Sequence, residues 1–207
     1  MSFLNKFIPG AAIALTISSC NMTQQPVDDF DYTVDRFADI EVLRYKVPGF
    51  EALSTQQKAL IYHLTEAAIA GRDILWDQNG KHNLRIRQVM EQIYTNYAGD
   101  KNADEFKAFE KYLKLIWFAN GIHHHYSMDK FIPEFSAEFF AAQVKALEPE
   151  SLPLNGQSVD EMIAELTPVI FDPTVMAKRV NQAEGEDLIT TSANNLYDGV
   201  TQAEVEE

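Results

Sequence analysis

Apolar side chains recur every three or four residues along three long segments, and this spacing most limits the folds open to the chain. The segments run over residues 54–76, 84–97 and about 103–118. Each has an apolar stripe that is typical of a helix packed on one side. Glycine and proline are scarce, 9 and 8 of 207 residues, which favours long regular elements over loops. The sequence therefore predicts a mainly α fold with a few short strands.

Polar residues stand where helices should begin. Ser54 and Gln57 have the spacing of a capping box, in which each side chain bonds the other residue's backbone N–H. Ser158 and Glu161 repeat this spacing, and Ser136 is a candidate cap for a helix between them. We therefore expect a series of capped helices in the body of the chain, residues 36–207.

Short apolar runs are the candidates for strands. Residues 40–47 mostly alternate apolar and polar side chains before Pro48-Gly49 ends the run, which indicates a strand. Residues 169–171 and 188–191 are also apolar, but runs this short do not distinguish a strand from a helix.

The cues near the end of the chain conflict with one another. Pro168 is expected to disturb its helix, and Asp172-Pro173 is expected to begin a short one, because proline is tolerated in a first turn.

Thr201 and Glu204 form a third capping box, although only about six residues follow and an isolated helix needs roughly 12–15. We interpret this as the start of a helix in a longer protein. A frayed tail is the alternative.

The N-terminal residues have the features of a bacterial lipoprotein signal peptide. Residues 1–19 contain an apolar run that is too short to span a bilayer, and Ile17, two serines and Cys20 then match a lipobox. We expect cleavage before Cys20, lipidation of Cys20, and a chain anchored in the bacterial cell envelope on the periplasmic or surface side. A buried cysteine in a hydrophobic leader is the alternative. Residues 20–35 are polar and predict a flexible tether.

The charge balance excludes several partners. The chain has 17 basic and 31 acidic residues and a net charge of −14, which argues against binding to nucleic acid or to anionic lipid headgroups. A single cysteine also excludes an internal disulfide framework and a zinc site made of thiolates alone.

The histidine triplet 123–125 is the most evident candidate for a metal site. On a strand, His123 and His125 would share a face, whereas consecutive residues of a helix cannot converge on one ion. A zinc site would need further ligands from elsewhere in the chain. The alternative is a polar loop after a helix, lining a cleft. The sequence has no H-E-x-x-H helix, G-x-S-x-G elbow or phosphate-binding glycine loop, so it offers no catalytic residue and no established metal ligand.

Three stretches resemble the N-terminal part of the dipeptidyl peptidase III family of zinc exopeptidases, especially its Bacteroidetes-type members. The similarity runs from about residue 35 to the last residue. The stretches are Phe50–Lys58 with Ala67–Asp73, then Trp117–Tyr126 with Asp129–Pro133, and finally Ile189–Asn195. Within them, Asn120-Gly121 and Lys130-Phe131 with Pro133 are the most specific units.

The resemblance implies a role for the parent protein rather than for this chain alone. Members of the family are longer, with two lobes around a cleft, and remove dipeptides from peptide N-termini. The early residues belong to the lobe without the metal, and the zinc-binding H-E-x-x-G-H helix lies downstream of any residue here. We therefore expect part of the non-metal lobe of a two-lobed α+β metallopeptidase. Such a part would bind no zinc and be inactive alone.

Three functional hypotheses remain open. In the first, the chain is this peptidase fragment, and Asn120, His123, His125 and Tyr126 face the substrate cleft, unless they belong to a surface or packing loop. The second is a complete, non-catalytic, lipid-anchored helical module that binds peptides or a partner protein. The third, and weakest, is an enzyme in which the histidine triplet itself binds a metal.

Overall fold

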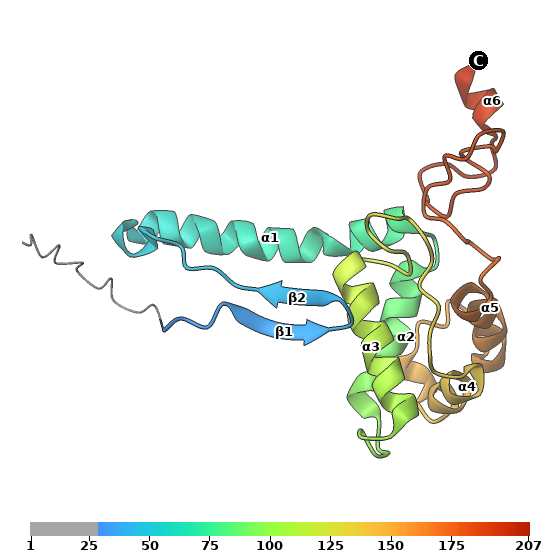
Figure 1. The fold of residues 1–207 in the computed structure, drawn as a ribbon, viewed down its shortest axis with the longest axis horizontal. Helices are drawn as coiled ribbons and strands as arrows, with labels where there is room; N and C mark the ends of the chain where they lie inside the picture. The colour runs from blue at the N-terminus through green and yellow to red at the C-terminus, as the bar shows by residue number, and fades with distance from the viewer. Residues whose placement is uncertain (1–28) are drawn as a thin grey trace, which may run out of the picture.

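The computed structural model describes residues 29–207, so Cys20 and the predicted signal peptide lie outside it. The fold is mainly helical with one two-stranded sheet, which confirms the predicted fold class (Figure 1). The elements are β1 (Thr33–Phe37), β2 (Ile40–Leu43), the short 3-10 helix η1 (Phe50–Ala52), α1 (Thr55–Asn79), α2 (Asn83–Asn96), α3 (Asp104–Ala119), α4 (Ala137–Lys145), η2 (Pro149–Ser151), α5 (Val159–Phe171) and α6 (Gln202–Glu206).

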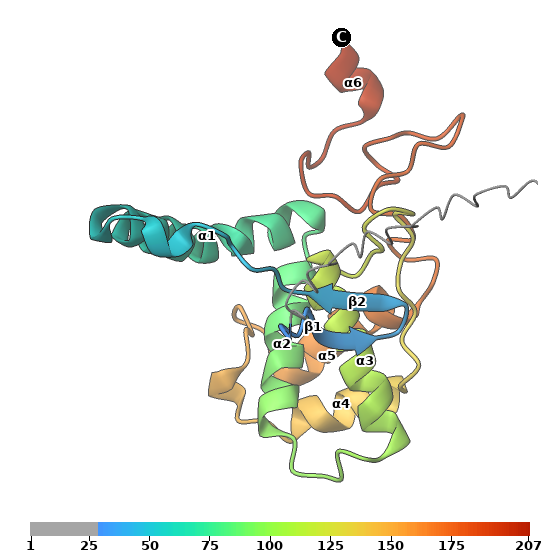
Figure 2. The ribbon, with the colours of Figure 1, turned by 60° about the vertical axis from the view of Figure 1, so that its left-hand side comes forward.

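Helices α2 to α5 form the hydrophobic core (Figures 1 and 2). The core is rich in aromatic rings: Phe109 lies edge-to-face with Phe135 at 5.4 Å, and Phe106 stacks on Tyr97 at 4.2 Å. Aromatic pairs at these separations add to the gain from burial alone. Aliphatic side chains that are fully buried fill the remaining space, among them Ile86, Val89, Leu113, Ile116 and Leu166.

Side chains cap the starts of α1, α4, α5 and α6, whereas α2 and α3 begin without a side-chain cap. Ser54, Ser158 and Thr201 each accept a hydrogen bond from the third residue of the helix, and that residue's side chain bonds back to the cap. Ser136 caps α4 through the backbone N–H of Phe139. These contacts confirm the three predicted capping boxes and the single cap, because each satisfies N–H groups that a helix start leaves free.

The sheet is an antiparallel hairpin that contacts α3. β2 ends at Leu43, earlier than the predicted 40–47, because Leu43 already pairs with Thr33, where β1 begins. β1 itself lies partly within residues 20–35, where a tether was expected. Its half-buried side includes the polar Asp35, which forms an ion pair with Lys114 of α3 at 2.9 Å. A polar inner face of this kind gives no apolar alternation to recognise in the sequence.

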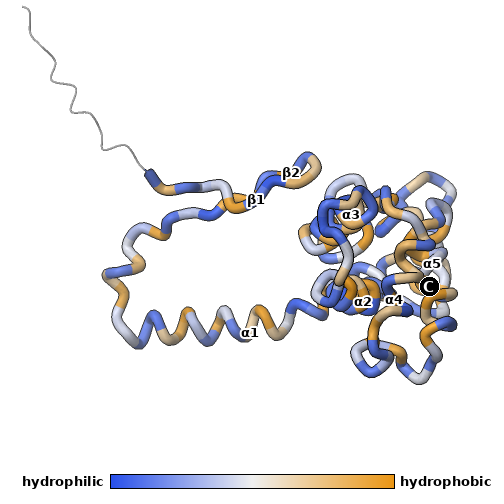
Figure 3. The backbone as a smooth tube through the Cα atoms, turned by 90° about the horizontal axis from the view of Figure 1, so that it is seen from below, coloured by the Kyte–Doolittle hydropathy of each residue, from blue (hydrophilic) through white to orange (hydrophobic). Residues whose placement is uncertain are grey.

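Helix α1 extends away from the core and is joined to it only at its C-terminal end (Figures 1 and 3). Its one buried side chain is Trp76, which lies under the guanidinium of Arg87 from α2 at 5.2 Å. Arg87 also donates to the carboxylate of Asp73 at 2.8 Å. Residues 59–70 are all exposed.

The region around residue 170 differs from the prediction. α5 continues through Pro168 to Phe171, although proline has no N–H to donate to the carbonyl one turn before it. The predicted helix at Asp172-Pro173 is absent among the described residues. The Asp172 carboxylate accepts bonds from the backbone N–H and the hydroxyl of Thr174, which holds a turn instead. Residues 169–171 are helical and 188–191 form a turn, so neither ambiguous run is a strand.

Candidate functional site

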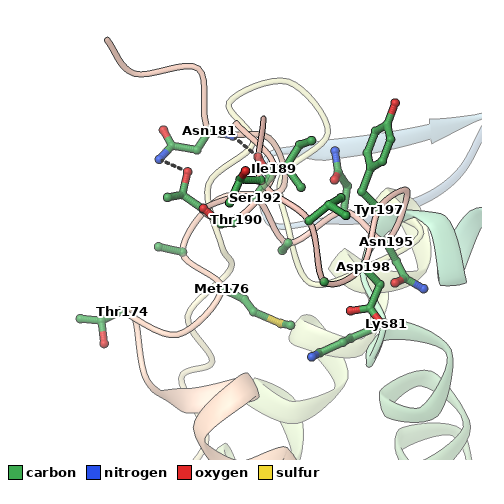
Figure 4. A pocket seen from close by; sticks show the side chains of 17 residues that line it. Lys81, Thr174, Met176, Asn181, Ile189, Thr190, Ser192, Asn195, Tyr197 and Asp198 are labelled. Atoms are coloured by element: carbon green, nitrogen blue, oxygen red, sulfur yellow. Dashed lines mark hydrogen bonds between the residues drawn. The ribbon is translucent and has the colours of Figure 1, made fainter. Parts of the chain in front are cut away.

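A cavity lies beside the C-terminal end of α1 (Figure 4). Its volume is about 720 Å³. Three parts of the chain form its walls. They are Lys81, which follows α1, residues of the segment 174–181 after α5, and the irregular segment 189–201. The lining combines apolar residues with neutral polar ones, which are Thr174, Asn181, Thr190, Thr191, Ser192, Asn194, Asn195, Tyr197 and Thr201. Lys81 and Asp198 are its only charged residues.

Hydrogen bonds hold the irregular wall of the cavity in place. The Asn181 side chain donates to the Thr191 hydroxyl at 3.0 Å, and the Asn181 backbone N–H donates to the Ser192 hydroxyl at 2.8 Å. The Asp187 carboxylate accepts bonds from the backbone N–H groups of Ile189, Thr190 and Gln202. These hydrogen bonds lower the pKa of Asp187, and the bond from the Thr190 backbone has the largest effect. Although it contains no helix or strand, the wall is a defined structure.

Backbone hydrogen bonds connect three distant segments behind this wall. Lys130 N–H donates to the Ala177 carbonyl at 3.1 Å, and Arg179 N–H donates to the Met128 carbonyl at 2.8 Å. Ala193 N–H then donates to the Lys178 carbonyl at 2.9 Å. Residues 128–130 and residue 193 therefore lie on either side of the segment 177–179.

His123 is a buried support for the cavity rather than part of its lining. Its Nε2 lies 2.7 Å from the Met176 carbonyl, and Met176 lines the cavity. Because a carbonyl only accepts hydrogen bonds, Nε2 carries the proton. Nδ1 is buried and has no hydrogen-bond partner. Burial lowers the pKa of His123, which favours the neutral ring.

Lys130 is the buried cation of this region, with 8% of its surface exposed. Its ammonium group donates to the carbonyls of Asp172 at 2.6 Å and Val175 at 3.0 Å, just after α5 ends. Cations suit the end of a helix, where carbonyl groups lack partners. Burial lowers the pKa of Lys130 to about 8. Lys130 thus fixes the start of the segment that carries Met176.

The other predicted cleft residues lie outside the cavity lining. Asn120 ends α3 with a left-handed backbone, φ 54°, and its carbonyl accepts a bond from the Asn79 side chain at 3.0 Å. The rings of His125 and Tyr126 are tilted relative to each other with their centroids 4.3 Å apart, and Tyr126 is 81% exposed. His125 and Tyr126 come together on the surface, while Asn120 and His123 serve as structural supports. That these four residues face a substrate cleft stays a prediction.

The histidine triplet does not converge. The ring of His123 is buried, whereas His124 and His125 stack on each other at 4.6 Å, and His124 Nδ1 accepts bonds from the N–H groups of Tyr126 and Ser127. Within residues 29–207, no group of three or more histidine, cysteine, aspartate or glutamate side chains could hold a metal ion.

The sequence interpretation did not select the cavity residues. Segment 189–195 stands out in the sequence only through its resemblance, and no motif marks Lys81 or Asp198. The available signal was a high density of asparagine, threonine and serine between residues 190 and 195, in a stretch without apolar periodicity.

Comparison with known proteins adds no relative. No protein-family model matches the chain, and no curated protein is found to be similar to it. Over residues 29–207, none of the helices has the length and apolar character needed to cross a membrane.

Proposed function

We propose that this chain is the N-terminal part of a zinc dipeptidyl peptidase of the dipeptidyl peptidase III type, and that its cavity contributes to peptide binding. The observation that carries the proposal is the convergence of two resembling stretches, 117–133 and 189–195. More than 50 residues separate them, yet both bond to the segment 177–179. These two stretches therefore pack on one segment, and only the second of them, 189–195, lines the cavity.

The chemistry of the cavity suits a peptide. Amide and hydroxyl side chains donate and accept hydrogen bonds without charge, as the backbone of a bound peptide requires. Asp198 is the one carboxylate of the lining and Lys81 its one ammonium. A free peptide N-terminus is a cation, so Asp198 is the group of this cavity that would attract it.

The residues described here do not fit a zinc site, so no catalytic step is assigned to them. The proposal places the zinc ligands elsewhere in the parent protein. The chain alone then binds peptides without cleaving them. It would be held in the bacterial cell envelope through a lipid on Cys20, which lies outside the described residues.

A second candidate is a complete peptide-binding lipoprotein without catalysis. The observation in its favour is the ordered cavity wall, which the hydrogen bonds of Asn181 and Asp187 hold in place. The coding sequence beyond Glu207 separates the two candidates. An open frame that encodes H-E-x-x-G-H supports the peptidase, whereas a natural stop codon supports the binding module.

Peptide binding can be tested by fluorescence polarisation with a labelled pentapeptide, compared with its N-acetylated form. The chain should bind the free-amine peptide more tightly. Asp198→Asn should weaken that binding about tenfold and leave the acetylated peptide unaffected, because a hydrogen bond to a charged group contributes about 1.5–3 kcal/mol. Glu184→Gln is the matched control, an exposed acidic residue of the same region outside the lining. Equal affinity for both peptides would contradict the role of Asp198.

Catalysis is tested separately with a dipeptidyl arylamide. The chain alone should release no dipeptide, with or without added zinc. Clear turnover would contradict the assignment of the zinc ligands to another part of the protein.

A further inference from the structure

One side chain of the cavity lining has a sulfur atom that can be oxidised reversibly. Four methionines lie within the described residues: Met90, Met128, Met162 and Met176. Met90 and Met162 are fully buried in the core, whereas Met128 and Met176 are partly buried. Of these four, only Met176 lines the cavity. Oxidants convert a methionine thioether to a sulfoxide, and reductases reverse the change.

The cavity gives a small oxidant access to Met176. Its volume of about 720 Å³ is many times the roughly 30 Å³ that one water molecule occupies in the liquid. Exposed residues, among them Lys81 and Asp198, belong to the lining, so the cavity opens to solvent. Hydrogen peroxide is close to water in size and polarity and can therefore reach the Met176 sulfur.

Hydrogen bonds fix the backbone that carries Met176. The Met176 carbonyl lies 2.7 Å from His123 Nε2. On either side of it, the carbonyls of Val175 and Ala177 accept bonds from Lys130, at 3.0 and 3.1 Å. The φ angle of Met176 is 52°, a left-handed conformation that a residue with a Cβ atom keeps only where its surroundings impose it. Bonds from behind the cavity wall thus hold the Met176 side chain in the lining.

Lys81 is the group that an oxidised Met176 would meet. The side chains of Met176 and Lys81 point toward each other in the cavity (Figure 4). Within residues 29–207, the Lys81 ammonium forms no ion pair or hydrogen bond. A thioether is a weak acceptor, so Met176 in its reduced form leaves this ammonium free. A sulfoxide oxygen carries partial negative charge and accepts hydrogen bonds strongly.

We propose that Met176 is an oxidant-sensitive switch of the cavity, with hydrogen peroxide as its oxidant. The sulfur attacks one peroxide oxygen and the O–O bond breaks. The proton of the transferred oxygen passes to the departing hydroxide, which leaves a sulfoxide and one water molecule. The sulfur loses two electrons and the peroxide gains them.

The switch acts through Lys81. The sulfoxide oxygen accepts a hydrogen bond from the Lys81 ammonium, which is then no longer free for a carbonyl or carboxylate group of a bound peptide. Oxidation therefore weakens peptide binding. This last step rests on the proposed function, whereas the oxidation of Met176 and its bond to Lys81 do not.

Mass spectrometry of the full chain after mild peroxide treatment tests the modification itself. Met176 should be oxidised on the order of tenfold faster than Met90 and Met162, because burial keeps the oxidant from those two. Met128 is the matched control for access, since it is also partly buried and left-handed, with φ 64°, but lies outside the cavity lining. Oxidation of Met176 as slow as that of Met90 would overturn the proposal.

The acetylation rate of Lys81 tests the new hydrogen bond without a peptide. A bond to the sulfoxide favours the protonated amine, which is not a nucleophile, so oxidation should slow the acetylation of Lys81 several-fold. Lys107, an exposed residue of α3, is the internal control and should keep its rate. Met176→Leu should abolish the difference at Lys81. An unchanged Lys81 rate in the oxidised chain would overturn the proposal.

Fluorescence polarisation with the labelled pentapeptide tests the effect on binding. The oxidised chain should bind about tenfold more weakly, as expected for the loss of a hydrogen bond to a charged group, and methionine sulfoxide reductase should restore the affinity. Met128→Leu should respond to peroxide as the unaltered chain does, whereas Met176→Leu should not respond. Equal responses of the two variants would overturn the proposal. A chain that binds no peptide before oxidation would contradict the proposed function alone, because the Lys81 rates still decide the switch.

Discussion

Helices α1 and α3 are both long and have an apolar side, yet only the apolar side of α3 is covered. Leu113 of α3 is fully buried, whereas Leu64 of α1 is 60% exposed. Both segments have the same three-and-four spacing in the sequence. Helical periodicity therefore identifies the face that needs a partner, but it does not identify the partner.

The largest expected change in stability comes from shortening a leucine in each of these two helices, which tests the difference directly. Leu113→Ala should lower the free energy of unfolding by about 2–5 kcal/mol, because it leaves a cavity in a packed core. Leu64→Ala should change it by no more than about 0.5 kcal/mol in the single chain, as expected for an exposed site. Urea denaturation at low protein concentration measures both. Similar losses would show that α1 is packed in solution as tightly as α3.

Replacing either of two glycines by alanine should change the stability of the fold by an intermediate amount, and the two changes should have opposite signs. At Gly121 a Cβ atom would lie 2.5 Å from the Asn83 side chain, and φ is 153°, so Gly121→Ala should destabilise the fold by about 1–3 kcal/mol. At Gly71 the space is empty, and Gly71→Ala should stabilise the single chain by up to about 1 kcal/mol. Thermal unfolding of the two variants measures the signs. A loss of stability at Gly71 in dilute solution would contradict the open environment of α1.

A third test is the pH dependence of stability that comes from Lys130. Its pKa is about 8 in the folded protein and 10.5 ordinarily, so the unfolded chain binds more protons between these values. The stability of the fold should therefore rise with pH through this window, by at most ~1.4 kcal/mol per pH unit. Lys130→Met should remove the rise, whereas Lys107→Met, at an exposed position, should keep it. Urea titrations at pH 7.5, 9 and 10 would measure the slopes. An equal slope in all three proteins would contradict the burial of the Lys130 charge.

Local chemistry explains which parts of the fold were predictable. Helix starts were, because a cap such as Ser158 and its partner Glu161 lie three residues apart. The strand β1 was not, because its inner residue Asp35 finds its partner, Lys114, 79 positions away. The absence of the helix predicted at Asp172 also depends on a partner that is distant in the sequence. There the nearby carbonyl groups bond to Lys130, a contact across 42 residues.

The candidate site was predictable only in part, for the same reason. The sequence directed attention to His123, and the structure shows this residue behind the cavity wall, bonded to Met176. The lining residues themselves, such as Asn181 and Tyr197, have no motif spacing. Their proximity depends on backbone bonds between segments that no local pattern records.

The attachment of α1 at only one end makes this helix a lever. Trp76, Arg87 and the bond from the Asn195 backbone N–H to the Gln78 carbonyl hold its last turns. With 25 residues at 1.5 Å each, the helix is about 37 Å long. A tilt of about 5° at the anchored end therefore displaces Thr55 by about 3 Å. The anchor borders the cavity, since both Asn195 and Lys81 line it. Small displacements of the cavity wall are thus amplified at the far tip.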